Sequence, residues 1–242
     1  MKSVAEHYDA HLGGVYGWML GDLDAAYRRA VAELHDMDVP PGHGAALDLG
    51  AGLGLHSVAL AELGYRVTAI DGCALLLEEL DRRRGSLPID IVQGDLCAFA
   101  QELRAPVDVI LILGDTLTHL PSFAAVESLL EQAAGHLGSG GLFAATFRDY
   151  ATKTLSGDER FILVRRDEER VLTCFLEYGD KTVAVHDILT ERKDKEWVQR
   201  VSSYPKLRLA PESVMQQLNN LGLKPRRETA PSGMVRIVAR RP

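Results

Sequence analysis

The fold of this chain is decided by the stretch Ala45-Ala46-Leu47-Asp48-Leu49-Gly50-Ala51-Gly52-Leu53-Gly54. Its first five residues form an apolar run of strand length, and a glycine-rich segment follows at once. Glycine is needed where the backbone takes a positive φ or where a ligand approaches the main chain closely. Apolar residues at helix spacing then continue over residues 53–63 and stop at Gly64. We therefore expect a strand, a ligand-binding turn and a helix, with the turn at the carboxyl end of the strand.

Strand-like and helix-like segments alternate from this turn to residue 147. Further strands are expected at residues 66–70, 89–92, 107–113 and 142–147, and helices at 74–84 and 123–137, with a break at 138–141. Alternation of this kind is typical of βαβ units. It predicts an α/β fold with a doubly wound, Rossmann-like sheet.

The pattern changes after residue 160. Short β-rich segments, separated by charged turns, lie at residues 161–164, 171–178, 182–191 and 197–204. Their partial alternation of apolar and polar residues predicts an antiparallel β-meander, inserted after the fifth strand and covering one edge of a pocket. A helix at 211–221 and a hairpin of 224–228 with 234–240 close the chain. Helices are expected before residue 40, the stronger one at Leu23–His35.

Composition sets the broad class. Hydrophobic residues make up 46% of the 242-residue chain and charged residues 25%, as in a soluble globular protein. The net charge of −7 gives no general attraction to nucleic acid or to an anionic membrane, so we expect neither as a partner. The three cysteines show no zinc-type spacing, so no metal site is expected. The first residues lack the apolar run of a secretory signal, and a cytoplasmic location is predicted.

The glycine spacing separates two classes of ligand. A dinucleotide site has the pattern G-x-G-x-x-G. If this pattern began at Gly50, its third glycine would stand at position 55, which is Leu55. In this chain the third glycine is Gly54 instead. Asp48, just before the turn, suits the amino group of a methionine moiety better than an anionic pyrophosphate. Asp71 ends the second strand, where an acid accepts hydrogen bonds from ribose hydroxyls. Asp95 follows the third strand, where it meets an adenine amino group.

Three acids at the ends of three successive strands predict S-adenosylmethionine rather than NAD(P) as the cofactor. The residues expected to bind it are Asp48, Gly50, Ala51, Gly52, Asp71, Gly72, Asp95, Leu96 and Leu113.

These motifs resemble those of class I S-adenosylmethionine-dependent methyltransferases over residues 45–147 and the closing hairpin. The resemblance rests on Asp48-x-Gly50-x-Gly52-x-Gly54, on Asp71 and on Gly94-Asp95. It implies a seven-stranded sheet whose last strand is antiparallel. It also implies one methyltransferase domain, divided into an N-terminal helical lid (1–40), a cofactor-binding core (41–150), the β-meander insertion (151–209) and a closing helix and hairpin (210–242).

Residues 113–121, 146–150 and 203–205 are similar to segments of glycine and sarcosine N-methyltransferases, and residues 7–9 and 15–22 resemble their N-terminal lid. In that family an Arg at the position of Arg148 binds the substrate carboxylate. The chain departs from the family at Asp115, where the family has Asn, and at Met19, where the lid has a second Tyr.

Methyl transfer from a sulfonium needs an aligned acceptor and a dry site rather than a nucleophile or a metal from the protein. Tyr8 and His119 are the candidates for positioning the acceptor through hydrogen bonds. Arg148 is expected to bind a carboxylate, Asp115 an ammonium or hydroxyl group, and Tyr204 to line the acceptor side. Each has a structural alternative: a helix cap for His119, a surface ion pair with Asp149 for Arg148, and packing for both tyrosines.

The preferred hypothesis is a methyltransferase that acts on a small molecule, an amine or amino-acid-like acceptor bearing a carboxylate. The alternative is a non-catalytic protein that binds S-adenosylmethionine or a partner with the same fold, because a fold does not fix a reaction. A nucleic-acid methyltransferase is disfavoured, since residues 114–117 lack the Asn/Asp-Pro-Pro-aromatic motif of enzymes that act on exocyclic amines. The glycine spacing also disfavours an NAD-dependent oxidoreductase.

Overall fold

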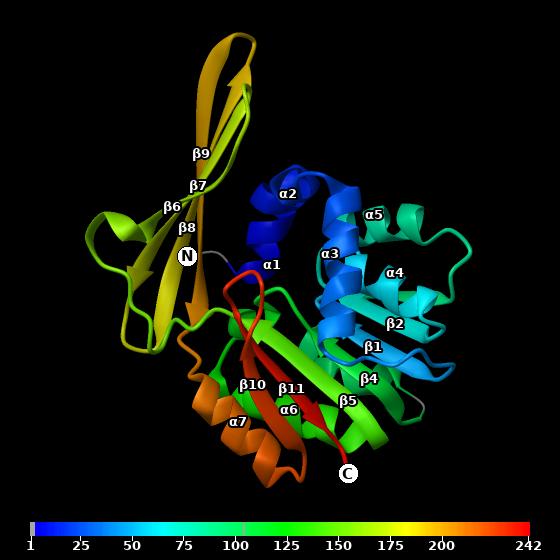
Figure 1. Ribbon diagram of the computed structural model, residues 1–242. Helices are drawn as coiled ribbons and strands as arrows, with labels where there is room; N and C mark the ends of the chain where they lie inside the picture. The colour runs from blue at the N-terminus through cyan, green and yellow to red at the C-terminus, as the bar shows by residue number, and fades with distance from the viewer. Residues whose placement is uncertain (1–2, 104) are drawn as a thin grey trace.

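The computed structural model describes residues 3–103 and 105–242 of the chain. It contains a seven-stranded sheet of order β10-β11-β5-β4-β1-β2-β3 and a four-stranded sheet of order β6-β7-β8-β9. Figure 1 shows the seven-stranded sheet covered by helices, with the four-stranded sheet projecting away from it to one side.

The seven-stranded sheet is parallel from β3 to β5, and β11 then runs antiparallel to both β5 and β10. This arrangement confirms the predicted α/β fold and its antiparallel last strand. The strands are β1 (Ala45–Leu49), β2 (Arg66–Asp71), β3 (Ile89–Gln93), β4 (Val107–Ile112), β5 (Leu137–Phe147), β10 (Lys224–Thr229) and β11 (Val235–Arg240).

Helices cover both faces of this sheet. Ile110 and Leu111 are neighbours on β4, yet they belong to two different buried clusters, one on each side of the sheet. A strand that is buried on both faces has a nearly continuous run of apolar residues, and for this reason the sequence pattern could predict β4. The longer helices are α3 (Leu23–Asp36), α4 (Leu55–Glu62), α5 (Ala74–Arg84), α6 (Phe123–His136) and α7 (Pro211–Asn220), and the short ones are η2 (Leu96–Glu102), η3 (Thr116–His119) and η4 (Gly157–Arg160).

The helix α6 ends at His136, as the glycines at residues 138–141 predicted, but the expected start of the fifth strand at residue 142 is wrong, because β5 begins at Leu137 and runs through this segment. The main-chain N–H of Gly140 donates to the carbonyl of Arg241, and the N–H of Arg241 donates to the carbonyl of Gly141, both at 3.0 Å. Pairing with the end of the chain therefore holds the glycine-rich segment in a strand. In this region the pairing of β5 with β4 is irregular, with a shift of register between Val107 and Val109.

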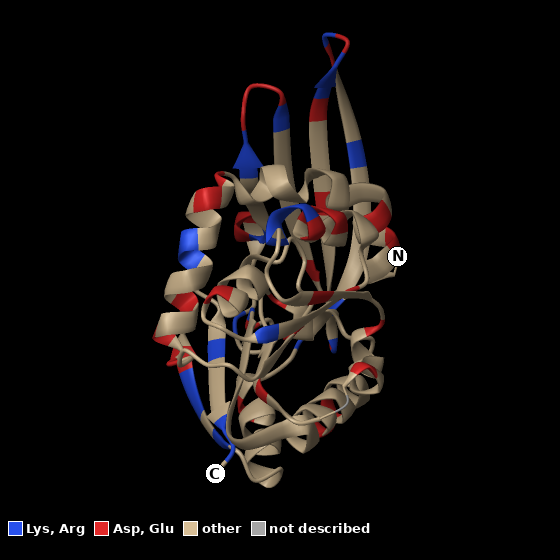
Figure 2. Cartoon of the chain, turned by 90° about the vertical axis from the view of Figure 1, so that its right-hand side faces the viewer, with Lys and Arg blue, Asp and Glu red and all other residues tan. Residues whose placement is uncertain are grey.

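The four-stranded sheet is the predicted antiparallel meander, made of β6 (Phe161–Arg166), β7 (Arg170–Tyr178), β8 (Thr182–Lys193) and β9 (Glu196–Leu207). One face is buried and includes Leu172, Val185 and Tyr204, whereas Leu163 and Val201 on the other face are more than half exposed. Figure 2 shows that charged residues gather at the tips of two hairpins of this sheet, which are the β6–β7 and β8–β9 hairpins.

The N-terminal helices α1 (Val4–His7), η1 (Tyr8–Leu12) and α2 (Gly13–Leu20) lie between the two sheets (Figure 1). Leu12 and Val15 pack against Leu172 and Leu189 of the meander. Tyr8 and Tyr16 contact a second cluster that contains Leu53, Cys73 and Leu76 of the core. The helices thus join the meander to the part of the core that follows β1 and β2. None of the described helices has the length and apolar character needed to cross a membrane.

Candidate functional site

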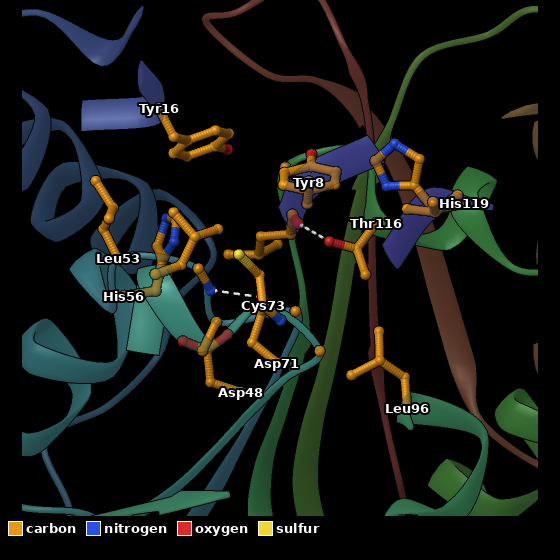
Figure 3. A pocket seen from close by; sticks show the side chains of 18 of the residues that line it. Tyr8, Tyr16, Asp48, Leu53, His56, Asp71, Cys73, Leu96, Thr116 and His119 are labelled. Carbon is orange, nitrogen blue, oxygen red and sulfur yellow. Dashed lines mark hydrogen bonds between the residues drawn. The ribbon is translucent and has the colours of Figure 1, made fainter. Parts of the chain in front are cut away.

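A cavity of about 580 Å³ opens at the carboxyl ends of β1, β2, β3 and β4, beneath the N-terminal helices (Figure 3). Open α/β sheets bind ligands at this edge. All the residues that the sequence predicted for cofactor binding line this cavity: Asp48, Gly50, Ala51, Gly52, Asp71, Gly72, Asp95, Leu96 and Leu113.

Two glycines of the turn after β1 have different functions in the fold. Gly52 and Gly54 both have positive φ, of 54° and 73°. A Cβ atom on Gly54 would lie 2.0 Å from Cδ1 of Leu80, whereas a Cβ atom on Gly52 would have no neighbour within 4 Å. Gly54 therefore permits close packing of α4 on α5. Gly52 leaves the main chain open toward the cavity, as a turn that binds a ligand requires.

The carboxylate of Asp71 is fixed at the end of β2 by two main-chain donors. Oδ2 accepts a hydrogen bond from the N–H of Gly52 and Oδ1 from the N–H of Cys73, both at 2.8 Å. Burial raises the pKa of Asp71, although these two hydrogen bonds reduce the rise. Each oxygen keeps acceptor capacity, because a carboxylate oxygen has two lone pairs. Asp71 thus fits a ligand with hydroxyl groups that lies across the glycine turn.

The other two predicted acids are also tied to the protein. Asp48 is almost fully buried, and its Oδ2 accepts a hydrogen bond from Oγ of Ser57 at 2.6 Å. Burial raises the pKa of Asp48 above its usual value. Asp95 caps η2 through the N–H of Cys97 at 2.9 Å. Both residues face the cavity while keeping a structural partner.

The cavity is acidic. Glu33, Asp48, Asp71 and Asp95 line it, and no Lys or Arg does so within residues 3–103 and 105–242. Clustered carboxylates in a partly enclosed space attract cations and repel anions. The lining therefore favours a positively charged ligand over a dinucleotide with its pyrophosphate.

Tyr8 and His119 lie together at the end of the cavity nearest the meander (Figure 3). Their ring centroids are 6.0 Å apart in an edge-to-face arrangement. Within the described residues, Nε2 of His119 is buried and has no hydrogen-bond partner. Burial and the positive charge of Lys206 lower the pKa of His119 to about 3, so the imidazole is neutral near pH 7. Burial raises the pKa of the Tyr8 hydroxyl far above its usual value, so this group keeps its proton.

Asp115 is buried behind this pair and lies outside the cavity lining. Its carboxylate accepts hydrogen bonds from Nζ of Lys206 at 2.5 Å, the N–H of Arg148 at 2.8 Å, Oγ1 of Thr118 at 3.0 Å and the hydroxyl of Tyr150 at 3.2 Å. Burial raises the pKa of Asp115, but Lys206 and the other donors outweigh burial and hold it below its usual value. The ammonium group that Asp115 binds in this structure therefore belongs to Lys206.

Two other predicted residues also lie outside the lining. The Arg148 side chain is exposed, and the residue is joined to the site by the hydrogen bond from its main-chain N–H to Asp115. Tyr204 is buried, with its ring stacked on that of His7 at 4.0 Å and 5.7 Å from that of His119. The structure thus places Tyr204 against the Tyr8–His119 pair and leaves Arg148 apart. The functional roles assigned to these residues stay predictions.

The sequence interpretation did not include Glu33, His56, Tyr16 or Lys206. The first three line the cavity, and Lys206 supports its wall. Strand alternation offered a signal for Lys206, because it lies two residues after Tyr204 and so faces the same way. Glu33 and His56 are on helices that no local pattern brings together.

Comparison with known proteins identifies the core. Residues 46–141 match the family model described as a methyltransferase domain. This match confirms the methyltransferase resemblance that the motifs around residues 48–54 predicted. Residues 46–141 are therefore a methyltransferase domain.

Three relatives illustrate the similarity. The cypemycin N-terminal methyltransferase of a Streptomyces species is 30% identical over 128 residues, or 52% of this chain and 51% of that protein. The glycine/sarcosine N-methyltransferase of Halorhodospira halochloris is 38% identical over 77 residues, or 31% of this chain and 28% of that protein. The chain thus spans about half the length of the first relative and less of the second.

The third relative is a solved structure, CalS10 with bound S-adenosylmethionine, an amino pentose methyltransferase from Micromonospora echinaspora. It superimposes with a TM-score of 0.74 at 17% identity, covering 91% of this chain and 96% of CalS10. At this identity the likeness shows a shared fold, and it includes the region of the meander.

Proposed function

We propose that this chain, whose residues 46–141 form a methyltransferase domain, is an S-adenosylmethionine-dependent methyltransferase that methylates the nitrogen of a small amine. The observation that carries the proposal is the acidic cavity beside the glycine turn. S-adenosylmethionine carries a permanent sulfonium charge, and this cavity has several carboxylates and no Lys or Arg among its described lining residues.

The residues present fit this cofactor. Gly52 leaves room for a ligand against the main chain, where a Cβ atom would fill open space. Asp71 is oriented by two main-chain donors for ribose hydroxyls, and Asp95 lies on the neighbouring side for an adenine amino group. When bound, the cofactor supplies an activated methyl group that an acceptor atom attacks in line.

The protein's contribution to such a reaction is to position the acceptor and exclude water. The unpartnered Nε2 of His119 is suited to accept a hydrogen bond from an acceptor N–H, because a neutral imidazole has one free lone pair. An imidazolium in the same place would have no free lone pair and could not accept this hydrogen bond. The protonated hydroxyl of Tyr8 lies beside it and provides a second polar contact. We assign both residues to acceptor positioning.

Nitrogen is the preferred acceptor atom for two reasons. The acidic lining attracts amines, and both sequence relatives are named as methyltransferases of an amino group: one of a peptide N-terminus and one of glycine and sarcosine. CalS10, with the same fold, is named as a methyltransferase of an amino sugar. An acceptor carboxylate bound by Arg148 is a separate proposal, and it requires an acceptor that extends from the cavity to the exposed guanidinium.

An acceptor screen with methyl-labelled S-adenosylmethionine tests the proposal. Small primary and secondary amines, amino acids and amino sugars are incubated with the protein, and labelled product is counted. We expect label in at least one amine and loss of transfer in Gly52→Val, which fills the space beside the turn. Cofactor binding without transfer to any acceptor would instead support the non-catalytic alternative.

Arg148→Ala separates the carboxylate proposal from the rest. If Arg148 binds an acceptor carboxylate, KM for that acceptor rises while the affinity for S-adenosylmethionine is unchanged. An unchanged KM would limit acceptor recognition to the cavity itself.

A further inference from the structure

The proposed cofactor ends in an amino acid group whose carboxylate needs hydrogen-bond donors or a positive charge. The acidic cavity offers neutral hydroxyl donors from Tyr and Thr side chains, but few groups that can carry a positive charge. Among the described lining residues only His56 and His119 have side chains that take on a positive charge. The methionine carboxylate therefore has two candidate partners of this kind.

His119 does not fit this role. Burial and the charge of Lys206 lower its pKa to about 3, so it offers no positive charge near neutral pH. It also lies beside Tyr8 at the end of the cavity assigned to the acceptor. This leaves His56.

His56 is in the first turn of α4, directly after the glycine turn. Its Nε2 atom lies 2.9 Å from Oε2 of Glu33 on α3, and both side chains line the cavity with 22% and 25% of their surface exposed. This contact engages Nε2 and leaves Nδ1 available for a ligand. Figure 3 shows His56 beside Asp48, at the opposite end of the cavity from His119.

Two carboxylates act on this imidazole. Burial raises the pKa of Glu33, but the hydrogen bond from His56 and the positive charges nearby outweigh burial and lower it, so Glu33 is ionised. Asp48 also interacts electrostatically with His56. The imidazole of His56 thus lies between the carboxylates of Glu33 and Asp48, an arrangement that suits a ligand group with both an ammonium and a carboxylate.

We infer that Glu33 and His56 recognise the amino acid end of the cofactor: the Nδ1 side of the His56 ring donates a hydrogen bond to the carboxylate, and Glu33, which contacts Nε2, orients that ring. The inference rests on the proposed function, because it assumes that S-adenosylmethionine occupies the cavity. Asp48 then lies next to the pair for the α-ammonium group.

The test compares two ligands that share the adenosine and the thioether but differ in the amino acid group. S-adenosylhomocysteine has this group, and 5′-methylthioadenosine lacks it. Their dissociation constants are measured by calorimetry for the wild type and for His56→Gln and Glu33→Gln. The matched control is His35→Gln, which removes an exposed imidazole from α3 outside the cavity.

We expect His56→Gln to weaken S-adenosylhomocysteine binding about tenfold or more, as the loss of a hydrogen bond to a charged group does. We expect Glu33→Gln to weaken it severalfold. Both variants are expected to bind 5′-methylthioadenosine as the wild type does, and His35→Gln to bind both ligands normally. Normal 5′-methylthioadenosine binding also shows that the variants are folded.

Two results would overturn the inference while leaving the proposed function intact. One is an unchanged affinity of His56→Gln for S-adenosylhomocysteine. The other is an equal loss of affinity for both ligands, which would mean that His56 supports the shape of the cavity. A wild-type protein that binds neither ligand would overturn the proposed function itself.

Discussion

Nζ of Lys206 lies 2.5 Å from Oδ2 of Asp115, within a buried ion pair that joins β9 of the meander to the loop after β4. Asp115 has a positive φ of 75°, which is uncommon for a residue other than glycine. Its side chain is held by four donors, and η3, which carries His119, begins at the next residue. The pair thus fixes the wall from which His119 faces the cavity.

Breaking this pair is expected to destabilise the protein. Lys206→Met leaves the carboxylate of Asp115 buried without its counter-charge, and such changes cost about 3 kcal/mol or more. The free energy of unfolding, measured by urea denaturation, gives the loss. Arg82→Met is the control, because Arg82 is exposed in its pair with Glu79 and its loss costs at most about 1 kcal/mol. Addition of Asp115→Asn should recover part of the loss, and strictly additive effects would contradict a coupled pair.

The two glycines of the turn are expected to give opposite phenotypes. Gly54→Ala brings a methyl group into Leu80, so it should lower the free energy of unfolding by more than Gly52→Ala does. Both glycines have positive φ, so either Ala strains the backbone, but the methyl group of Gly52→Ala meets no neighbouring atom; this variant should therefore lose less stability while it weakens S-adenosylmethionine binding. Urea denaturation and calorimetry on both variants check the two expectations. A reversed order, with the greater loss of stability at Gly52, would argue against the assignment of that space to a ligand.

The affinity for S-adenosylmethionine is expected to fall at acidic pH. Burial raises the pKa of Asp48 and of Asp71 above the usual 3.8, so both carboxylates take up protons at a higher pH than an exposed Asp does. Only the ionised forms attract the sulfonium and ammonium charges. The dissociation constant should therefore rise as the pH falls from 7 toward 4, and the rise should begin above the ordinary carboxyl range.

Asp71→Asn provides the comparison for this pH dependence. The variant should bind S-adenosylmethionine about tenfold more weakly at pH 7, since it loses charged hydrogen bonds. Its dissociation constant should change less with pH than that of the wild type. Parallel pH profiles would assign the dependence to other groups.

His119 is expected to make folding stability sensitive to mild acid. Its pKa is about 3 in the folded protein, against a usual value of 6.5. Between these two pH values the imidazole is protonated in the unfolded chain and neutral in the folded protein. The contribution of the neutral imidazole is thus complete above pH 6.5 and is lost progressively as the pH falls toward 3. Between pH 7 and 4.5 the wild type should lose more free energy of unfolding than His119→Gln. Urea denaturation at several pH values measures this, and equal losses would show that His119 is protonated in the fold.

The sequence predicted the cofactor side of the site better than the acceptor side. The strands of the core are buried on both faces, and Asp48, Asp71 and Asp95 follow their carboxyl ends, so strand recognition alone places these acids together. The α/β fold was predicted from the same strand pattern, and the antiparallel last strand from the resemblance to class I methyltransferases; both are confirmed. The start of β5 was predicted wrongly, because its glycine segment is held by Arg241 at the far end of the chain.

The remaining contacts depend on packing between distant elements. Asp115 meets Lys206 across 91 residues, and Glu33 meets His56 between two helices. Strand alternation indicates which face of β9 carries Lys206, but neither pairing can be read from the sequence, since each requires the relative placement of elements that only the tertiary structure fixes.

The position of the N-terminal helices has a consequence for biosynthesis. Nδ1 of His7 lies 2.9 Å from Oγ of Ser202, which is 195 residues further along the chain, and Leu12 packs on Leu172 and Leu189. Contacts between segments so far apart form late, because the intervening chain must first be made and ordered. The residues that cover the cavity therefore leave the ribosome early but reach their final place only after the meander has folded.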